Sequence, residues 1–246
     1  VKEKAIQLLK DGVVDRVIGW KAGEFFYDLT PAVFTSAEEV EKDFVWSVFS
    51  AANVSKYLIA ESKKGGRIAA FLKPCDSYSF VQLCKEHRIA KENVYVVGVQ
   101  CDGTCDIEKL KALGFKGVTG VEERGEELLV STLYGGKTAA KKDALLERCT
   151  VCKSKRIAYF DELLGEQGED CGDARFETVE KLEAMTPEER FAFWRGELSR
   201  CIRCNACRNV CPACSCEKCV FDNHALGTDN KAAADDFEEN FFHIIR

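Results

Sequence analysis

The fold is decided by residues 67–101, which read RIAAFLKPCDSYSFVQLCKEHRIAKENVYVVGVQC. The pattern predicts a buried strand over Arg67–Leu72, a helix over Ser77–His87 and a second buried strand over Asn93–Val99. Two buried strands joined by a helix form a βαβ unit, in which the strands pair in parallel. The stretch therefore predicts an α/β fold with a parallel sheet.

Cysteines follow both predicted strands at their carboxyl ends. The first loop is Lys73-Pro74-Cys75-Asp76, and the second is Gln100-Cys101-Asp102-Gly103-Thr104-Cys105. Ligands of open α/β sheets bind beyond the carboxyl ends of the strands, so we expect these three thiols to meet at one edge. The alternative is that they are buried free cysteines of an ordinary core, which is the role expected for Cys84 within the helix.

Weaker patterns describe the rest of the first domain. We expect a helix over 2–9, a strand over 13–18, a core-facing helix from 38 to 59, an inserted hairpin over 120–136 and a helix over 140–147. Cys149 and Cys152 follow the last helix and raise the number of thiols to five, one more than a four-ligand cluster needs. Which of the five is spare stays open: Cys75, Cys101, Cys105, Cys149 and Cys152.

The domain boundary is predicted in the polar, glycine-containing stretch 165–173. Residues 1–170 then form an α/β redox domain with an irregular iron–sulfur site, and 171–246 form linker helices and a small ferredoxin-like cysteine-rich module. A short helix is expected over 179–184. Another begins at Thr186-Pro187-Glu188-Glu189, which has the composition of a capping box with proline at the first helical position.

The second domain carries the most specific motif of the chain, Cys201-x2-Cys204-x2-Cys207-x3-Cys211-Pro212. Bacterial-type ferredoxins hold a 4Fe-4S cluster with this spacing, and their fourth cysteine serves a second cluster. Structural zinc prefers two separated cysteine pairs, often with histidine, and disulfides need an oxidising compartment. The spacing therefore favours an iron–sulfur cluster over both.

Three further thiols, Cys214, Cys216 and Cys219, bring this module to seven, which is too many for one cluster and one short of two. Either one cluster forms and the remaining thiols are structural, or two form with an eighth ligand from Cys171 or from the first domain. Both alternatives stay open. In either case metal binding is expected to contribute to the folding of the module.

Composition excludes several other classes of function. The chain has 246 residues, 46% hydrophobic content, 14 Cys, 3 His and a formal net charge of -6. A nucleic-acid surface needs clustered Lys and Arg, and a membrane span needs roughly 20 apolar residues, and neither is found. The first residues do not resemble a secretion signal, so we expect a cytoplasmic location.

Both ends of the chain suggest a fragment. The sequence does not begin with Met, and apolar residues at helical spacing over 234–246 run to Arg246 without a terminator. The pattern predicts a helix that is cut, and therefore a subunit truncated at its C-terminus.

The order of the cysteine motifs resembles the beta subunit family of coenzyme F420-reducing hydrogenase and formate dehydrogenase. The resemblance rests on Lys-Pro-Cys75-Asp, Gln-Cys101-x-Gly-x-Cys105, Cys149-x2-Cys152 and the run that begins at Cys201. It implies a flavin-binding α/β domain with an unusual 4Fe-4S cluster. It also implies partners that are other oxidoreductase subunits, of hydrogenase, formate dehydrogenase or heterodisulfide-reductase type.

The cofactors implied are two to three 4Fe-4S clusters and FAD. No Gly-x-Gly-x-x-Gly fingerprint is found, so the flavin rests on the resemblance and on the strand-end loops. Within those loops we assign Lys73, Asp76 and Gly103 as cofactor-binding residues.

The leading hypothesis is an electron-transfer subunit of an anaerobic oxidoreductase complex, in which clusters relay single electrons to or from the flavin. A second is a cluster-containing scaffold that holds a partner and has no turnover of its own. A third is a zinc-binding regulatory protein. Nucleophilic cysteine catalysis fits poorly, because no His lies near Cys75 or Cys101 in the sequence, and no residue is assigned as catalytic.

Overall fold

The predicted βαβ unit forms the centre of the chain's larger sheet. In the computed structural model, which describes residues 1–170, 174–202, 204 and 206–217, β4 (Ile68–Leu72) pairs in parallel with β5 (Val94–Val99). Helix α4 (Pro74–Lys85) connects them. All five residues of β4 are buried, as expected for a strand covered on both faces. The α/β fold with a parallel sheet is confirmed.

Six strands among the described residues make up this sheet, in the order β2-β1-β4-β5-β9 with β3 paired to β1. Strands β1, β4, β5 and β9 are parallel, whereas β2 and β3 pair antiparallel with β1. The remaining strands of this sheet are β1 (Arg16–Ala22), β2 (Leu29–Phe34), β3 (Phe44–Val45) and β9 (Glu162–Leu164).

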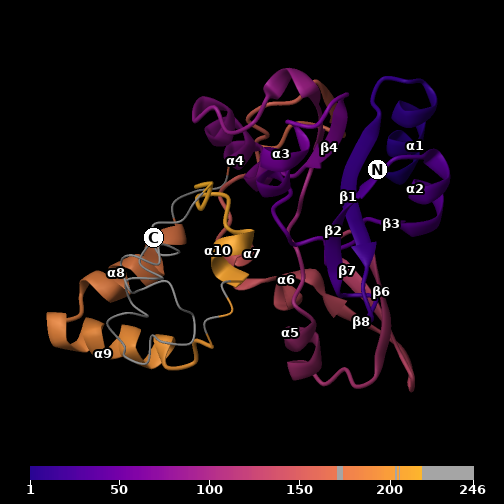
Figure 1. The fold of residues 1–246 in the computed structure, drawn as a ribbon. Helices are drawn as coiled ribbons and strands as arrows, with labels where there is room; N and C mark the ends of the chain where they lie inside the picture. Colours follow the sequence, from indigo (N-terminus) through magenta and orange to yellow (C-terminus); the bar gives the residue numbers. More distant parts are fainter. Residues whose placement is uncertain (171–173, 203, 205, 218–246) are drawn as a thin grey trace. The chain divides into compact units, whose positions relative to one another are not determined.

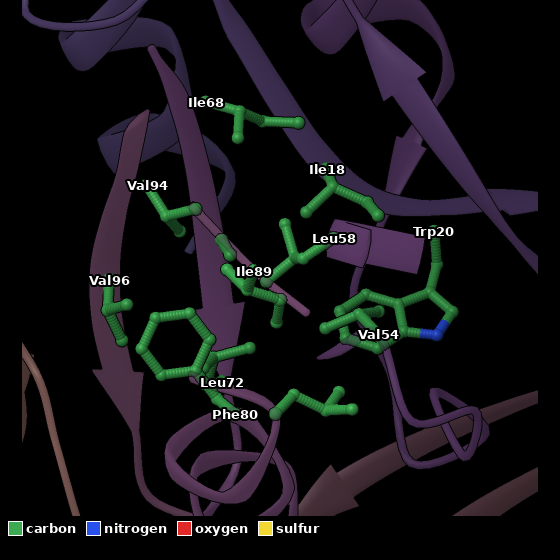
Figure 2. Close-up of a cluster of buried hydrophobic side chains, with 12 residues drawn as sticks. Ile18, Trp20, Val54, Leu58, Ile68, Leu72, Phe80, Ile89, Val94 and Val96 are labelled. Carbon is green, nitrogen blue, oxygen red and sulfur yellow. The ribbon is translucent and has the colours of Figure 1, made fainter. Parts of the chain in front are cut away.

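Helices cover both faces of the sheet. Figure 1 shows α1 and α2 on one side of it and α3 and α4 on the other. The side chains of Ile18, Leu58 and Phe80 come from β1, α3 and α4 and are at most 1% exposed, in the cluster that Figure 2 shows. A second cluster on the other face contains Leu8 and Val40. The helices are α1 (Lys2–Lys10), α2 (Ala37–Asp43) and α3 (Ser55–Glu61), and a 3-10 turn, η1 (Lys91–Asn93), precedes β5.

The single long helix expected from 38 to 59 is wrong. Helix α2 ends at Asp43, β3 follows directly, and α3 begins only at Ser55. The reason lies in β1, where a Cβ at Gly19 would clash with the ring of Phe44. Because Gly19 leaves space on the sheet for this aromatic ring, Phe44 and Val45 become a strand instead of continuing the helix.

The inserted hairpin is a three-stranded antiparallel sheet. It contains β6 (Val118–Arg124), β7 (Glu127–Thr132) and β8 (Gly135–Ala140), in that order. The helix expected over 140–147 is interrupted as well. It forms two short pieces, α6 (Lys141–Ala144) and α7 (Glu147–Thr150), because Cys105 and Leu145 form a β-bridge between them. Helix α5 (Ile107–Ala112) begins shortly after Cys105, the other residue of this bridge.

Contacts along the chain separate it into two units, Val1–Gly172 and Asp173–Arg246. The second unit contains η2 (Ala174–Phe176), α8 (Glu177–Glu183), α9 (Pro187–Leu198) and α10 (Ala206–Val210). The capping box of α9 is confirmed, since Thr186 Oγ1 accepts from Glu189 N at 3.2 Å and the Glu189 carboxylate accepts from Thr186 N at 2.9 Å. The helix expected over 234–246 lies outside the described residues. Within the described part of the chain, no helix is both long enough and apolar enough to cross a bilayer.

Candidate functional site

Four thiols of the first unit line one small cavity of about 40 Å³. Cys75 lies in the first turn of α4, Cys101 follows β5, Cys149 lies in α7, and Cys152 follows that helix. The cavity is also lined by Lys73, Gly103, Thr104, Arg148 and Lys155, among others. The predicted meeting of strand-end cysteines is therefore observed for Cys75 and Cys101, and the later pair joins them.

The second pair is delivered by backbone pairing between distant segments. Leu146 N donates to Thr104 O at 2.8 Å, and Asp106 N donates to Ala144 O at 2.8 Å. These bonds hold the start of α7 against the loop that follows β5. Cys149 is thereby brought to the carboxyl edge of the sheet from a segment more than forty residues away.

Cys105 separates from the other four. It is 4% exposed and lies in a hydrophobic cluster with Leu110 and Leu128, beneath the small sheet. Its amide donates to Val48 O at 2.7 Å, which turns the chain away from the cavity. Cys84, near the end of α4, packs against the core, in agreement with the structural role expected for it.

Hydrogen-bond donors surround two of the four sulfur atoms. Gly103 N donates to Cys101 Sγ at 3.4 Å, and Thr104 N donates to Cys149 Sγ at 3.5 Å. The Thr104 hydroxyl lies 3.3 Å from the same Cys149 sulfur. Gly103 has φ +104°, a conformation that other residues rarely adopt, and this bend points successive amides at the sulfurs. Such N–H donors are a regular feature around thiolates that bind metal clusters.

Burial favours the protonated form of two of these thiols, Cys75 and Cys101. Desolvation, followed by the charge of the neighbouring Asp76, raises the pKa of Cys75 to about 12, although this residue reaches the surface. Desolvation also raises the pKa of Cys101. Any metal group bound here must therefore displace protons, and its binding is coupled to their release.

The donor set of the small cavity is four thiols. Among residues 1–170, 174–202, 204 and 206–217, no group of three His, Cys, Asp or Glu side chains is arranged to hold a single metal ion. In a cubane each thiolate binds a different iron atom, so its four ligands stand further apart than those of one zinc. Four thiols on one cavity, with N–H donors to the sulfurs, fit a 4Fe-4S cluster.

A larger cavity of about 330 Å³ adjoins the first, and Lys73, Cys101, Gly103 and Thr104 line both. Its other walls come from the loop before α3, the loop after β5, the small sheet and the start of α6: Trp46, Ser47, Val48, Ser50, Gln100, Asp102, Val121, Glu122, Glu123 and Lys141. Two of the three residues assigned to a cofactor, Lys73 and Gly103, therefore line a cavity. Asp76 does not, because it is 0% exposed and lies behind Lys73.

Comparisons with known proteins find relatives among beta subunits of F420-dependent formate dehydrogenases. No protein-family model matches it. It is 26% identical over 276 aligned positions to "F420-dependent formate dehydrogenase 1 subunit beta" of Methanococcus maripaludis, covering 87% of this chain and 71% of that protein. It is also 26% identical to "F420-dependent formate dehydrogenase subunit beta" of Methanocaldococcus jannaschii, with 91% and 74% covered. The chain is a homologue of these beta subunits. The resemblance predicted from the cysteine motifs is confirmed.

The fold of this beta-subunit homologue is also seen in a solved structure. A chain of the F420-reducing NiFe hydrogenase complex of Methanosarcina barkeri aligns with a TM-score of 0.50 and 17% identity. The alignment covers 63% of this chain and 58% of that one. At this identity the match shows a shared fold.

The second unit of the homologue carries seven thiols between Cys201 and Cys219, of which four have ferredoxin spacing and six are described. Cys207 lies in α10, and its carbonyl accepts from Cys211 N at 3.1 Å, so the two lie one helical turn apart. Cys201, Cys211 and Cys214 are partly buried, whereas Cys204, Cys207 and Cys216 are exposed. Cys171 and Cys219 lie outside the described residues.

Sequence reasoning missed the basic groups beside the thiols. Arg148 lines the small cavity and donates to Ala51 O at 2.8 Å, and Lys155 lines it and donates to Cys101 O at 3.2 Å. Lys141, which is 4% exposed, pairs with Glu123 at the wall of the larger cavity. The run of Lys and Arg over 148–156 is a signal for the first two, whereas nothing local marks Lys141.

Proposed function

We propose that this chain is an iron–sulfur electron-transfer subunit of an oxidoreductase complex. The partners would be formate dehydrogenase, hydrogenase or heterodisulfide-reductase-type subunits. The proposal is carried by the convergence of Cys75, Cys101, Cys149 and Cys152 on one cavity. It is supported by the similarity to beta subunits of F420-dependent formate dehydrogenases.

The first cluster would be a 4Fe-4S centre on these four thiols, with Cys105 as the spare fifth. Cys105 is unsuitable because it is buried among apolar side chains, where it neither lines the cavity nor can reach it without unpacking the small sheet. Gly103 N, Thr104 N and the Thr104 hydroxyl would stabilise the thiolate form through hydrogen bonds. Lys155 and Arg148 would offset part of the negative charge.

The larger cavity is the proposed place for a flavin, with FAD as the candidate. Its volume of about 330 Å³ is within the range of ligand sites, and it shares a wall with the thiol cavity. Lys73 and Gly103 would contact the flavin, whereas Asp76 would hold Lys73 in place. When bound, the cluster supplies one-electron transfer and the flavin supplies one- or two-electron chemistry.

The second unit would hold one or two more clusters, for a total of two to three. The ligands are drawn from Cys201, Cys204, Cys207, Cys211, Cys214, Cys216 and Cys219. The ferredoxin spacing supports the first of these clusters. Electrons would pass between this unit, the four-thiol site and the partner subunits.

The test is the iron, sulfide, zinc and flavin content of the anaerobically reconstituted chain. We expect about eight to twelve irons and equal sulfide per chain, since each cluster holds four. Cys101→Ser is expected to lose about four of them. The matched variant Cys105→Ala, which removes a thiol four residues away in the sequence, should keep its full iron content.

Two outcomes would contradict the proposal. Zinc without acid-labile sulfide would show a zinc protein. A loss of about four irons in Cys105→Ala, with no loss in Cys101→Ser, would show that the cavity thiols are not the ligands. A chain that retains iron but binds no flavin would reduce the proposed role to that of a one-electron relay.

A further inference from the structure

Lys73 occupies the wall that the two cavities share. It is 3% exposed, lies at the end of β4 and lines both the four-thiol cavity and the larger one. The other residues that line both cavities are Cys101, Gly103 and Thr104. Of these four, Lys73 alone carries a positive charge.

The ammonium group is fully engaged by its surroundings. Lys73 Nζ donates to Ser50 O at 2.6 Å and to Ala52 O at 3.2 Å, and it lies 3.3 Å from Asp76 Oδ2. It also lies 4.6 Å from the centroid of the Trp20 ring. A lysine has three N–H donors, and three acceptors are present. Lys73 is therefore held in one position and acts on an occupant of either cavity through its charge, without a hydrogen bond of its own to spare.

The charge of Lys73 reaches the thiol site. Desolvation raises the pKa of the Cys101 thiol, and the Gly103 amide and then the charge of Lys73 act against it. At Cys75, Asp76 outweighs Lys73, because the carboxylate is the immediate neighbour of that cysteine. Geometry links Lys73 to Cys101 as well, since both residues line the two cavities.

We propose that Lys73 sets the reduction potential of the cluster held by Cys75, Cys101, Cys149 and Cys152. This inference rests on the proposed function. Reduction adds one electron to the cluster, with no bond made or broken, and so increases its negative charge by one. A buried, fixed positive charge stabilises the reduced state more than the oxidised state, because both charges are shielded from water. Lys73 thus makes the cluster easier to reduce, and it acts on the cluster through its charge alone.

The experiment is an anaerobic redox titration of the full reconstituted chain with dithionite as the electron donor, monitored by EPR. The signal of this cluster is the one that Cys101→Ser removes and Cys207→Ser retains. In Lys73→Met, which keeps the length of the side chain and removes its charge, we expect a more negative midpoint potential. The ratio of reduced to oxidised cluster at fixed potential should fall about tenfold, which for a one-electron couple is about 59 mV.

Three companion variants separate charge from structure. Lys73→Arg keeps the charge and should restore the potential of the unsubstituted chain. Lys73→Met/Asp76→Asn removes both charges of the buried pair, and because loss of the carboxylate opposes loss of the ammonium, its negative shift should be smaller than that of Lys73→Met. Lys91→Met removes the same charge at η1, at the opposite end of β5 from Cys101, and should leave the potential unchanged.

The possible failures are distinguishable. If the unsubstituted chain holds no EPR-active cluster, the proposed function fails and this inference fails with it. If the cluster assembles with normal iron content and Lys73→Met titrates like Lys91→Met, the inference about Lys73 fails alone. If Lys73→Arg does not restore the potential of the unsubstituted chain, the effect comes from packing, and the inference about Lys73 also fails.

Discussion

The Thr104 hydroxyl lies 3.3 Å from Cys149 Sγ, across 45 positions of sequence. The amide of Thr104 donates to the same sulfur at 3.5 Å. Thr104 is 5% exposed, so water cannot readily replace either bond. This pair joins the loop after β5 to α7, beside the backbone bonds that hold the same two segments together.

Thr104→Val is expected to change the cluster without preventing its assembly. The variant keeps the shape of the side chain and the amide donor but removes the hydroxyl. Since hydrogen bonds to sulfur stabilise the more negative, reduced cluster, its midpoint potential should become more negative. The EPR-monitored titration described above measures this. Thr132→Val, at the β7–β8 turn, is the control, and an equal shift in that variant would contradict the assignment.

Asp76→Ala is expected to destabilise the first unit strongly. The carboxylate is 0% exposed and accepts from Lys73 N at 3.3 Å as well as pairing with Lys73 Nζ. Removing one partner of a buried ion pair costs about 3–5 kcal/mol, because the other charge stays buried without compensation. Urea unfolding of the metal-free chain, followed by circular dichroism, would give the value.

Asp106→Ala is the control for Asp76→Ala. Asp106 caps α5 by accepting from Glu108 N at 2.9 Å, on the surface of the same unit. Loss of such a cap costs about 1 kcal/mol. If both variants lower the free energy of unfolding by the same amount, the buried Lys73–Asp76 pair contributes no more to stability than the surface cap does.

Gly19→Ala tests the close approach of β3 to β1. The new Cβ would overlap the ring of Phe44, which is 3% exposed and cannot move outward without opening the core. Overpacking of this kind costs about 1–3 kcal/mol, so the thermal midpoint should fall. Gly65→Ala, where nothing lies within 4 Å of the added atom, is the matched control and should leave the midpoint nearly unchanged.

Acidification should weaken the start of α2. The Glu39 carboxylate accepts from Thr35 N at 2.7 Å and from Thr35 Oγ1 at 3.0 Å, and these bonds lower the pKa of Glu39 below its usual 4.5. The bonds favour the ionised form, so their contribution to stability is complete above the unfolded pKa. It is lost as pH falls through the folded pKa. Unfolding of Glu39→Gln should therefore depend less on pH in the acid range than that of the unsubstituted chain. Glu41→Gln, an exposed carboxylate on the same helix, serves as the reference, and the same change there would refute the prediction.

Local patterns were sufficient where neighbours in sequence decide the structure. The βαβ unit follows from two short apolar runs around a helical segment, and the start of α9 follows from Thr186 and Glu189. Local patterns were insufficient where a residue distant in the sequence decides the structure. Phe44 leaves a helical pattern because Gly19 receives its ring, and Leu145 interrupts another because Cys105 pairs with it. Strand β9 was not predicted, since only its parallel pairing with β5 makes those three residues a strand.

By itself the sequence determined the α/β class, the family resemblance and the set of five candidate thiols. These depend on residue type, spacing and local periodicity, which are properties of the linear chain. Only the tertiary structure decided that Cys149 and Cys152 join Cys75 and Cys101, that Cys105 turns into the core, and that Lys73 lies between two cavities. The reason is physical: cysteines four residues apart can be held on opposite sides of a bend, and the backbone pairing of residues 104–106 with 144–146 aims each thiol.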